Sequence, residues 1–114
     1  MEHIPLPVDR AREKRPIHVE FTPSSFPGQR FAVRFNWNSS SGHWVIELEH
    51  LRREFTITKS MATPYRPYSY LPYLVFVLAD TAGEVTAVTP TNLGDEVKLW
   101  VLPGPSGQQE TEDT

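Results

Sequence analysis

The fold is decided by one stretch of the sequence, Phe31-Ala-Val-Arg-Phe-Asn-Trp-Asn-Ser-Ser-Ser-Gly-His-Trp-Val-Ile-Glu-Leu-Glu49. Large apolar side chains occupy every second position in both of its halves: Phe31, Val33, Phe35 and Trp37, then Trp44, Ile46 and Leu48. Because successive side chains of a strand point to opposite faces, this alternation predicts two strands with one apolar face each. The small polar segment 38–42 favours a hairpin connection between them. A lone hairpin is marginal in water, so other strands must cover the apolar face.

Five further segments carry strand signals and are separated by turn residues. They are 17–21, 54–58, 74–79, 84–88 and 96–102. The segment Leu74-Val-Phe-Val-Leu-Ala79 is apolar at every position, so we expect a central strand that is covered on both faces. About seven short strands without a helical segment predict an all-β fold, a small antiparallel β-sandwich or barrel.

Composition divides the 114 residues into three parts. Residues 1–16 contain three prolines and four basic side chains, and we expect an extended N-terminal arm, either loose or ordered against a partner. Residues 17–103 hold the predicted strands and form the β-domain. Residues 104–114 are polar and acidic, and we expect a disordered C-terminal tail.

Several classes of protein are excluded by composition and charge. The chain has no cysteine, so neither a disulfide framework nor a thiolate metal site is expected. Its formal net charge of −3 argues against a nucleic-acid partner. The longest apolar run, 74–79, is too short to cross a membrane, and the first residues lack the pattern of a secretory signal.

The polar residues form no motif that is typical of catalysis or metal binding. Residues 39–41 are serines close to His43, but a hairpin tip is solvated and offers no oxyanion hole. His43 and His50 lie at an odd separation on one predicted strand and therefore face opposite sides. Glu47 and Glu49 share a strand face, whereas the carboxylates of a glycosidase flank a cleft. We expect no enzyme activity, no cofactor, no metal and no small-molecule substrate.

The aromatic residues allow two interpretations. Three tryptophans and four tyrosines could form a stacking platform for sugars or bases. Alternatively, the tryptophans face the core and the tyrosines line a protein interface, where tyrosine is enriched. We favour the second, because the tyrosines lie in the Tyr/Pro-rich segment 59–73, and long loops of this kind are usually functional or packed on a partner.

Several motifs, taken in order, resemble the small baseplate plug proteins of contractile-tailed bacteriophages. The similar segments are 31–48 and 70–100. They include Trp44 after a polar turn, Asp80-Thr-Ala-Gly83 after an apolar strand, and Leu93-Gly94 before the last strand. The segment 51–73 departs from the family, since its Tyr/Pro run replaces a glycine-bearing turn.

The resemblance implies a structural component of a phage tail baseplate that plugs the axial lumen and contacts hub, spike and tail-tube proteins. It implies a place in the virion, synthesis in the host cytoplasm, and several copies in a symmetric assembly. No membrane partner is expected. The expected partner-binding residues are Arg10, Arg12, Arg15, Tyr65, Arg66, Tyr68, Tyr70 and Tyr73. The alternative is a carbohydrate-binding β-sandwich module that uses the Trp/Tyr platform.

Overall fold

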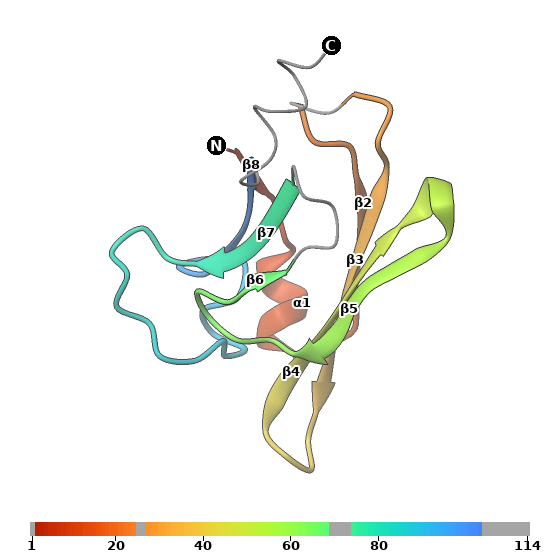
Figure 1. Cartoon of the computed structure of the whole chain (residues 1–114). Coiled ribbons are helices and arrows are strands. Elements are labelled where there is room, and N and C mark those ends of the chain that lie inside the picture. The colour runs from red at the N-terminus through yellow and green to blue at the C-terminus, as the bar shows by residue number, and fades with distance from the viewer. Residues whose placement is uncertain (1, 25–26, 69–73, 104–114) are drawn as a thin grey trace.

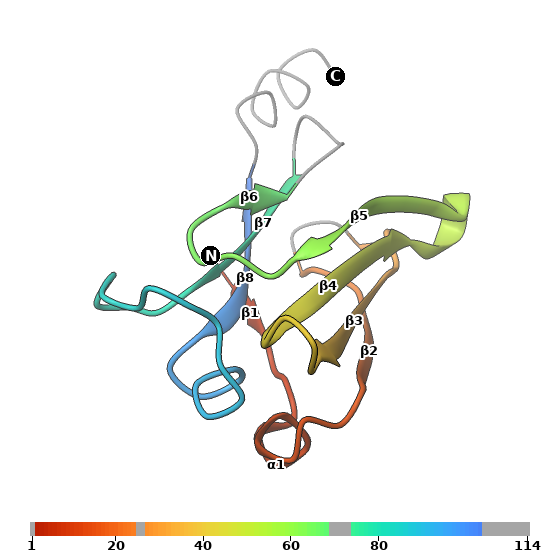
Figure 2. The same ribbon diagram turned by 90° about the horizontal axis from the view of Figure 1, so that it is seen from below.

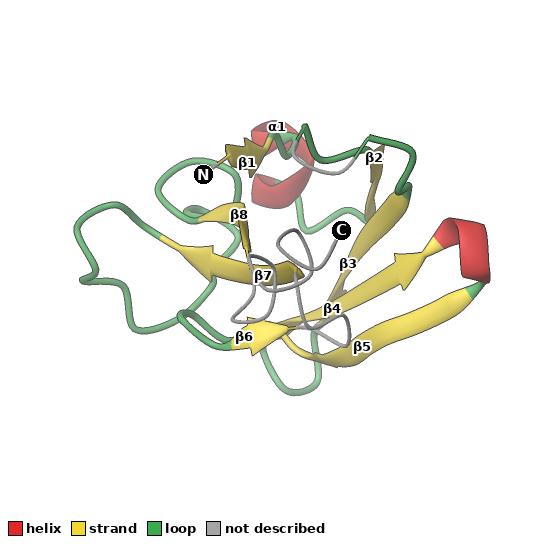
Figure 3. Ribbon diagram, turned by 45° about the horizontal axis from the view of Figure 1, so that its top comes forward, coloured by secondary structure: helices red, strands yellow, loops and turns green. Residues whose placement is uncertain are grey.

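The computed structural model describes residues 2–24, 27–68 and 74–103, and they form two antiparallel four-stranded sheets (Figure 1). Sheet A has the strand order β1-β8-β7-β6, and sheet B has the order β2-β3-β4-β5. The strands of sheet A are β1 (Glu2–Ile4), β6 (Pro67–Tyr68), β7 (Leu74–Ala79) and β8 (Lys98–Pro103). Those of sheet B are β2 (Ile17–Phe21), β3 (Phe31–Asn38), β4 (His43–His50) and β5 (Phe55–Met61). Two short helices, α1 (Val8–Arg12) and the 3₁₀ helix η1 (Leu51–Arg53), complete the described elements (Figure 3).

The predicted hairpin is confirmed as β3 and β4, the two central strands of sheet B. Phe35 lies opposite Ile46 and Trp37 lies opposite Trp44 in the register. The turn is closed by a hydrogen bond from the Gly42 amide to the Asn38 carbonyl, at 2.8 Å. Gly42 has a φ of +71°, a conformation that glycine adopts at no steric cost. The predicted inner side chains are fully buried except for the half-buried Trp37.

The core lies between the two sheets, which form a sandwich. Sheet A contributes alternate side chains of β7 and β8, namely Leu74, Phe76, Leu78, Leu99 and Val101. The Phe76 ring packs edge-on against Phe31 of sheet B, with ring centroids 5.2 Å apart. Such an edge-to-face pair adds about 0.5–1.5 kcal/mol to the burial of the rings. The all-β prediction is therefore confirmed, and of its two alternatives the structure is the sandwich.

The N-terminal segment differs from the expected extended arm. Its first residues form β1, which pairs with β8 so that Ile4 lies opposite Leu99. Ile4, Leu6 and Ala11 are buried in the core, and α1 follows directly. A Cβ on Gly94 would lie 3.0 Å from the Leu6 carbonyl oxygen, so only glycine allows this close approach. Burial of these apolar residues offsets the entropy that is lost when the segment becomes ordered. The prolines and charges of the segment gave no sign of this burial.

Two further segments differ from the sequence-based prediction. The segment 84–88 is a loop, although its apolar residues alternate. Val85 and Val88 pack on the core from this loop without a partner strand. In contrast, β6 forms within the Tyr/Pro-rich segment, which was expected to have no secondary structure. The expected C-terminal tail, 104–114, lies outside the described residues.

Candidate protein-docking surface

The outer face of sheet B is mostly polar, although Val45 and Met61, which is 51% exposed, lie opposite each other on it. One row of residues crosses all four strands through His18, Arg34, Glu47 and Lys59, each paired with the next. The Arg34 guanidinium also binds the Glu49 carboxylate at 2.9 Å. This face is the ordinary solvent side of a sandwich, where charged side chains alternate with buried apolar ones.

The outer face of sheet A is largely apolar, in contrast, and its polar residues are His3 and Lys98, opposite Trp100 and Ala79 respectively. Val75, Val77 and Ala79 of β7 point to this side, because Leu74, Phe76 and Leu78 take the inner positions. Trp100 and Leu102 of β8 extend the surface. These five apolar residues are half-buried, so the expectation that 74–79 is covered on both faces is met only on the inner side. We call this surface, Val75, Val77, Ala79, Trp100 and Leu102, the docking surface.

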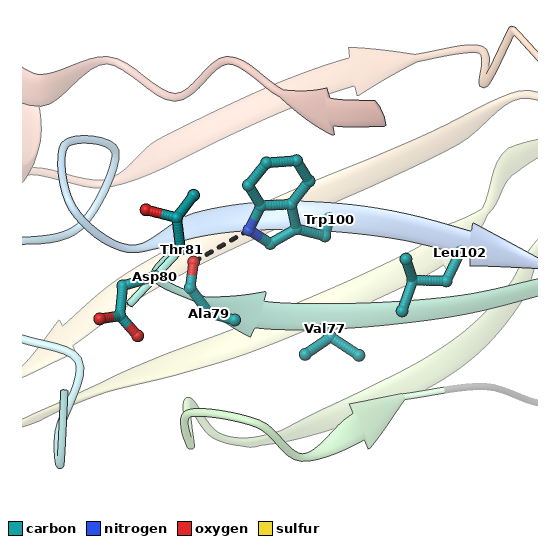
Figure 4. A pocket seen from close by; sticks show the side chains of 6 residues that line it. All are labelled: Val77, Ala79, Asp80, Thr81, Trp100 and Leu102. Atoms are coloured by element: carbon teal, nitrogen blue, oxygen red, sulfur yellow. Dashed lines mark hydrogen bonds between the residues drawn. The ribbon is translucent and has the colours of Figure 1, made fainter. Parts of the chain in front are cut away.

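A hollow of about 340 Å³ lies on the docking surface (Figure 4). Its lining consists of Val77, Ala79, Asp80, Thr81, Trp100 and Leu102. The Trp100 indole N–H donates to the Ala79 carbonyl at 3.0 Å, as the dashed line in Figure 4 marks. The His3 ring packs edge-on against the indole, with centroids 5.3 Å apart. Because its only polar atom is already bonded, Trp100 presents hydrocarbon to whatever fills the hollow.

Asp80 forms the polar end of the hollow. The Tyr65 hydroxyl donates to one oxygen of this carboxylate, and the Glu84 amide donates to the other at 3.0 Å. These hydrogen bonds, that of Tyr65 first, hold the pKa of Asp80 below its ordinary value, so the group stays ionised at neutral pH. Desolvation, followed by the contact with Asp80, raises the pKa of Tyr65.

Tyr65 is fixed in an unusual backbone conformation beside the docking surface. Its φ is +64°, which non-glycine residues adopt rarely. The Tyr65 amide donates to the Leu78 carbonyl at 2.8 Å, and its hydroxyl reaches Asp80 two residues further on. Two bonds to the end of β7 thus hold this residue, whose side chain remains 43% exposed. Tyr65 is a predicted partner-binding residue, and it lies at the rim of the hollow.

The other predicted residues of the Tyr/Pro loop are not all on the surface. Tyr68 is only 3% exposed and belongs to the core. Its hydroxyl donates to the Met61 carbonyl and accepts from the Thr63 amide, at 3.1 and 3.0 Å. Arg66 is exposed, with its guanidinium 5.8 Å from the centroid of the Tyr68 ring. Tyr70 and Tyr73 lie outside the described residues.

The three predicted arginines of the N-terminal segment are exposed, and all lie in or just after α1. Arg10 donates from Nε to the Pro16 carbonyl at 2.9 Å. Arg15 forms an exposed ion pair with Glu13 at 3.2 Å. α1 begins four residues after β1 ends, so these cations lie beyond the strand ends of sheet A and away from the docking surface (Figure 2).

The tryptophans do not assemble into one platform. Trp44 is fully buried, and the Trp37 ring packs edge-on against it with centroids 5.4 Å apart. The Lys14 ammonium lies 5.4 Å from the centroid of the Trp37 ring. Trp100 belongs to the other sheet and to its outer face. The interpretation of Trp37 and Trp44 as core residues therefore describes the structure better than the platform.

Sequence reasoning did not single out the aliphatic residues of the docking surface. The sequence did contain a signal for this surface, because the segment 74–79 is apolar at odd and even positions alike. Among the described residues, no group of three or more histidine and acidic side chains is placed to hold a metal ion. In the same part of the chain, no helix has the length and apolarity that crossing a bilayer requires.

Comparison with known proteins identifies the family. The family model described as the cyanophage baseplate Pam3 plug gp18 matches residues 1–104 of this chain. No curated protein and no solved structure matches. The match covers both sheets, the docking surface and the N-terminal segment. The chain belongs to the baseplate plug family of cyanophage tails.

Proposed function

We propose that the protein plugs the axial lumen of the baseplate and binds the hub and spike proteins through the docking surface. It is made in the host cytoplasm, acts in the virion in several copies, and has no catalytic role. The observation that carries this proposal is the largely apolar outer face of sheet A, whereas the outer face of sheet B, on the opposite side of the sandwich, is mostly polar. Apolar patches rimmed by polar residues mark interaction sites on proteins.

The two outer faces of the sandwich differ in whether they need a partner to cover them. Sheet B carries paired charges on its outside, so water solvates it well. Sheet A exposes aliphatic and aromatic surface that a neighbouring chain would remove from water, at about 25 cal/mol for each Å² buried. The hollow beside Trp100 would accept an apolar side chain of that neighbour.

The test is complementation of a phage that lacks this gene. The variant Val77→Glu places a charge in the centre of the docking surface, and we expect complete baseplates to fall at least tenfold. The matched control is Thr56→Glu, which adds the same charge to an exposed position on the outer face of sheet B and should assemble normally. Circular dichroism of both purified variants checks that each is folded.

Two results would count against the proposal. A folded Val77→Glu variant that assembles as well as the wild type would show that this face binds nothing essential. Averaged electron micrographs of baseplates that carry a tagged protein give the position directly. Density away from the central axis would refute the plugging role while leaving membership in the family intact.

The carbohydrate-binding alternative draws on one observation, an aromatic ring beside a carboxylate in the hollow. Sugar binding usually needs free polar groups next to the ring, which fix the hydroxyls. Here the Trp100 N–H binds Ala79, and both Asp80 oxygens already accept hydrogen bonds. We therefore prefer a protein partner, and specific glycans bound on an array with loss in Trp100→Ala would reverse this preference.

A further inference from the structure

The strand β5 forms one edge of sheet B (Figure 3). Within the described part of the chain, β4 is its only neighbour in the sheet. An edge strand presents unpaired N–H and C=O groups, which are a template for a strand of another chain. β5 contains no proline and only one charged residue, Lys59, so its sequence leaves this pairing open.

The pairing of β5 with β4 determines which backbone groups point to the open side. The Ala62 amide, just beyond β5, donates to the Trp44 carbonyl at 2.8 Å, and the register has no shift from there to Lys59. In an antiparallel pair, only every second residue exchanges hydrogen bonds with the partner strand. Ala62 and Ser60 therefore bond to β4, whereas the N–H and C=O groups of Lys59 and Met61 point away from it.

One of these four outward groups is already bonded within the chain. The Met61 carbonyl accepts hydrogen bonds from the Tyr68 hydroxyl, at 3.1 Å, and from the Thr63 hydroxyl, at 3.2 Å. The Lys59 amide, the Lys59 carbonyl and the Met61 amide have no partner among the described residues. Both residues are exposed. We call Lys59–Met61 the free edge, because it offers two donors and one acceptor in a row to an incoming strand.

The charges of sheet B indicate what the incoming strand carries opposite Lys59. On the outer face, one row of residues crosses the four strands through His18, Arg34, Glu47 and Lys59. The row thus ends in a cation at the free edge. Opposite charges on neighbouring strands stabilise their pairing, and like charges directly opposite weaken it. The next position of the row therefore favours an acidic residue.

The row beside it is apolar at the same edge. Val45 of β4 lies opposite Met61, whose side chain is 51% exposed. An apolar residue two positions from the acidic one would lie next to Met61 on the same face. Ser60 points to the other face, where its hydroxyl lies 3.2 Å from that of Thr58. A polar residue between the apolar and the acidic one matches this hydroxyl pair.

We propose that the free edge binds an extended segment of a neighbouring baseplate protein as a fifth strand of sheet B. The segment runs antiparallel to β5 and has the pattern apolar, polar, acidic, with the acidic residue opposite Lys59. In strand addition, main-chain hydrogen bonds supply affinity and alternate side chains supply specificity. A second copy of β5 does not fit, because it contains no acidic residue to meet Lys59. The free edge belongs to sheet B, so this contact is independent of the docking surface on sheet A.

The test uses the labelled full chain and a synthetic peptide, acetyl-Thr-Thr-Val-Thr-Glu-Thr-Thr-amide. In antiparallel pairing its glutamate lies opposite Lys59 and its valine opposite Met61. Hydrogen exchange followed by NMR reports which amides are bonded. Without peptide, the Lys59 and Met61 amides should exchange quickly and the Ser60 amide slowly. Peptide at several millimolar should slow the exchange of the Lys59 and Met61 amides at least threefold.

Altered peptides separate the backbone contribution from the charge. N-methylation of the glutamate keeps its charge but removes the N–H that the Lys59 carbonyl would accept, and it should weaken binding at least tenfold. A peptide with lysine instead of glutamate should also bind at least tenfold more weakly, and the variant Lys59→Glu should restore its binding. The matched control is Arg52→Glu, an exposed cation of η1, which should bind the original peptide like the wild type.

Three results would overturn the proposal. Equal binding of the N-methylated peptide would show charge attraction without strand addition. Unchanged exchange of the Lys59 and Met61 amides at every peptide concentration would show that the free edge accepts no strand. The third comes from assembled baseplates that carry a photoreactive side chain at position 59. Its cross-link should map to an extended segment of another protein with the expected pattern, and a cross-link only to a second copy of this chain would contradict the assigned partner.

Discussion

The contrast between the two faces of sheet A can be measured with one conservative substitution made twice. Val77 and Val101 lie on neighbouring strands, opposite Trp100 and Phe76 respectively. Val77 is half-buried on the outer face, whereas Val101 is 4% exposed on the inner face. Valine to threonine keeps the shape and the β-branch and replaces one methyl group by a hydroxyl. The two variants therefore differ only in what surrounds that hydroxyl.

The expected losses in the free energy of unfolding follow from these positions. In Val101→Thr the hydroxyl enters an apolar core, which costs about 1–3 kcal/mol. In a domain of this size each kcal/mol lowers the melting temperature by roughly 4–8 °C. In Val77→Thr the hydroxyl reaches water, and the change should stay within about 0.5 kcal/mol. Urea unfolding of the isolated protein, followed by circular dichroism, measures both.

Equal losses in the two variants would refute the reasoning. They would mean that another part of the chain covers Val77 and that the outer face of sheet A is a second core. The slope of the free energy with urea concentration must stay the same in both, because a changed slope reports a changed unfolded or native state. A large loss in Val77→Thr alone would contradict the assignment of inner and outer faces.

Three further predictions concern single residues. Tyr65→Phe removes the donor that lowers the pKa of Asp80, so that pKa should rise in an NMR titration. A carboxyl group whose pKa is lower in the folded than in the unfolded state stabilises the fold at any pH above its unfolded pKa. This stabilisation is lost as the pH falls through the folded pKa. The Tyr65→Phe variant should therefore lose less stability than the wild type over this acidic range. Tyr68→Phe leaves the Thr63 amide without its acceptor and should lower the free energy of unfolding by about 1–3 kcal/mol, measured in urea. Leu48→Ala empties a fully buried site in sheet B and should cost about 2–5 kcal/mol in the same assay.

The central hairpin could be predicted because its period is long and regular. The large inward side chains of β3 and β4 occupy every second position, with only Ala32 and Val45 as apolar residues between them, and the register follows from the turn. β1 and α1 could not be predicted, since three and five residues contain too little periodicity to recognise. Both depend on contacts with β8 and the core that are remote in sequence.

The docking surface could be predicted only in part from the sequence. Residues 74–79 are apolar at odd and even positions alike, which indicates a strand that is covered on both faces. The pattern does not say which of the two faces is covered by the same chain. The tyrosines show the opposite difficulty. Tyr65 and Tyr68 are three residues apart in one loop, yet one is exposed and the other is in the core. The two tyrosines differ because β6 pairs with β7, which places Tyr68 opposite Phe76 in the core.

The pairing of β1 with β8 has a consequence for biosynthesis. Among the described residues, β1 has no neighbour in the sheet except β8, which is translated after all the other described strands. Ile4 and Leu6, which are buried in the folded protein, therefore stay exposed to solvent until β8 has emerged. Completion of sheet A becomes the closing step of folding, and a nascent chain that stalls before residue 98 retains an open edge on which other proteins can aggregate.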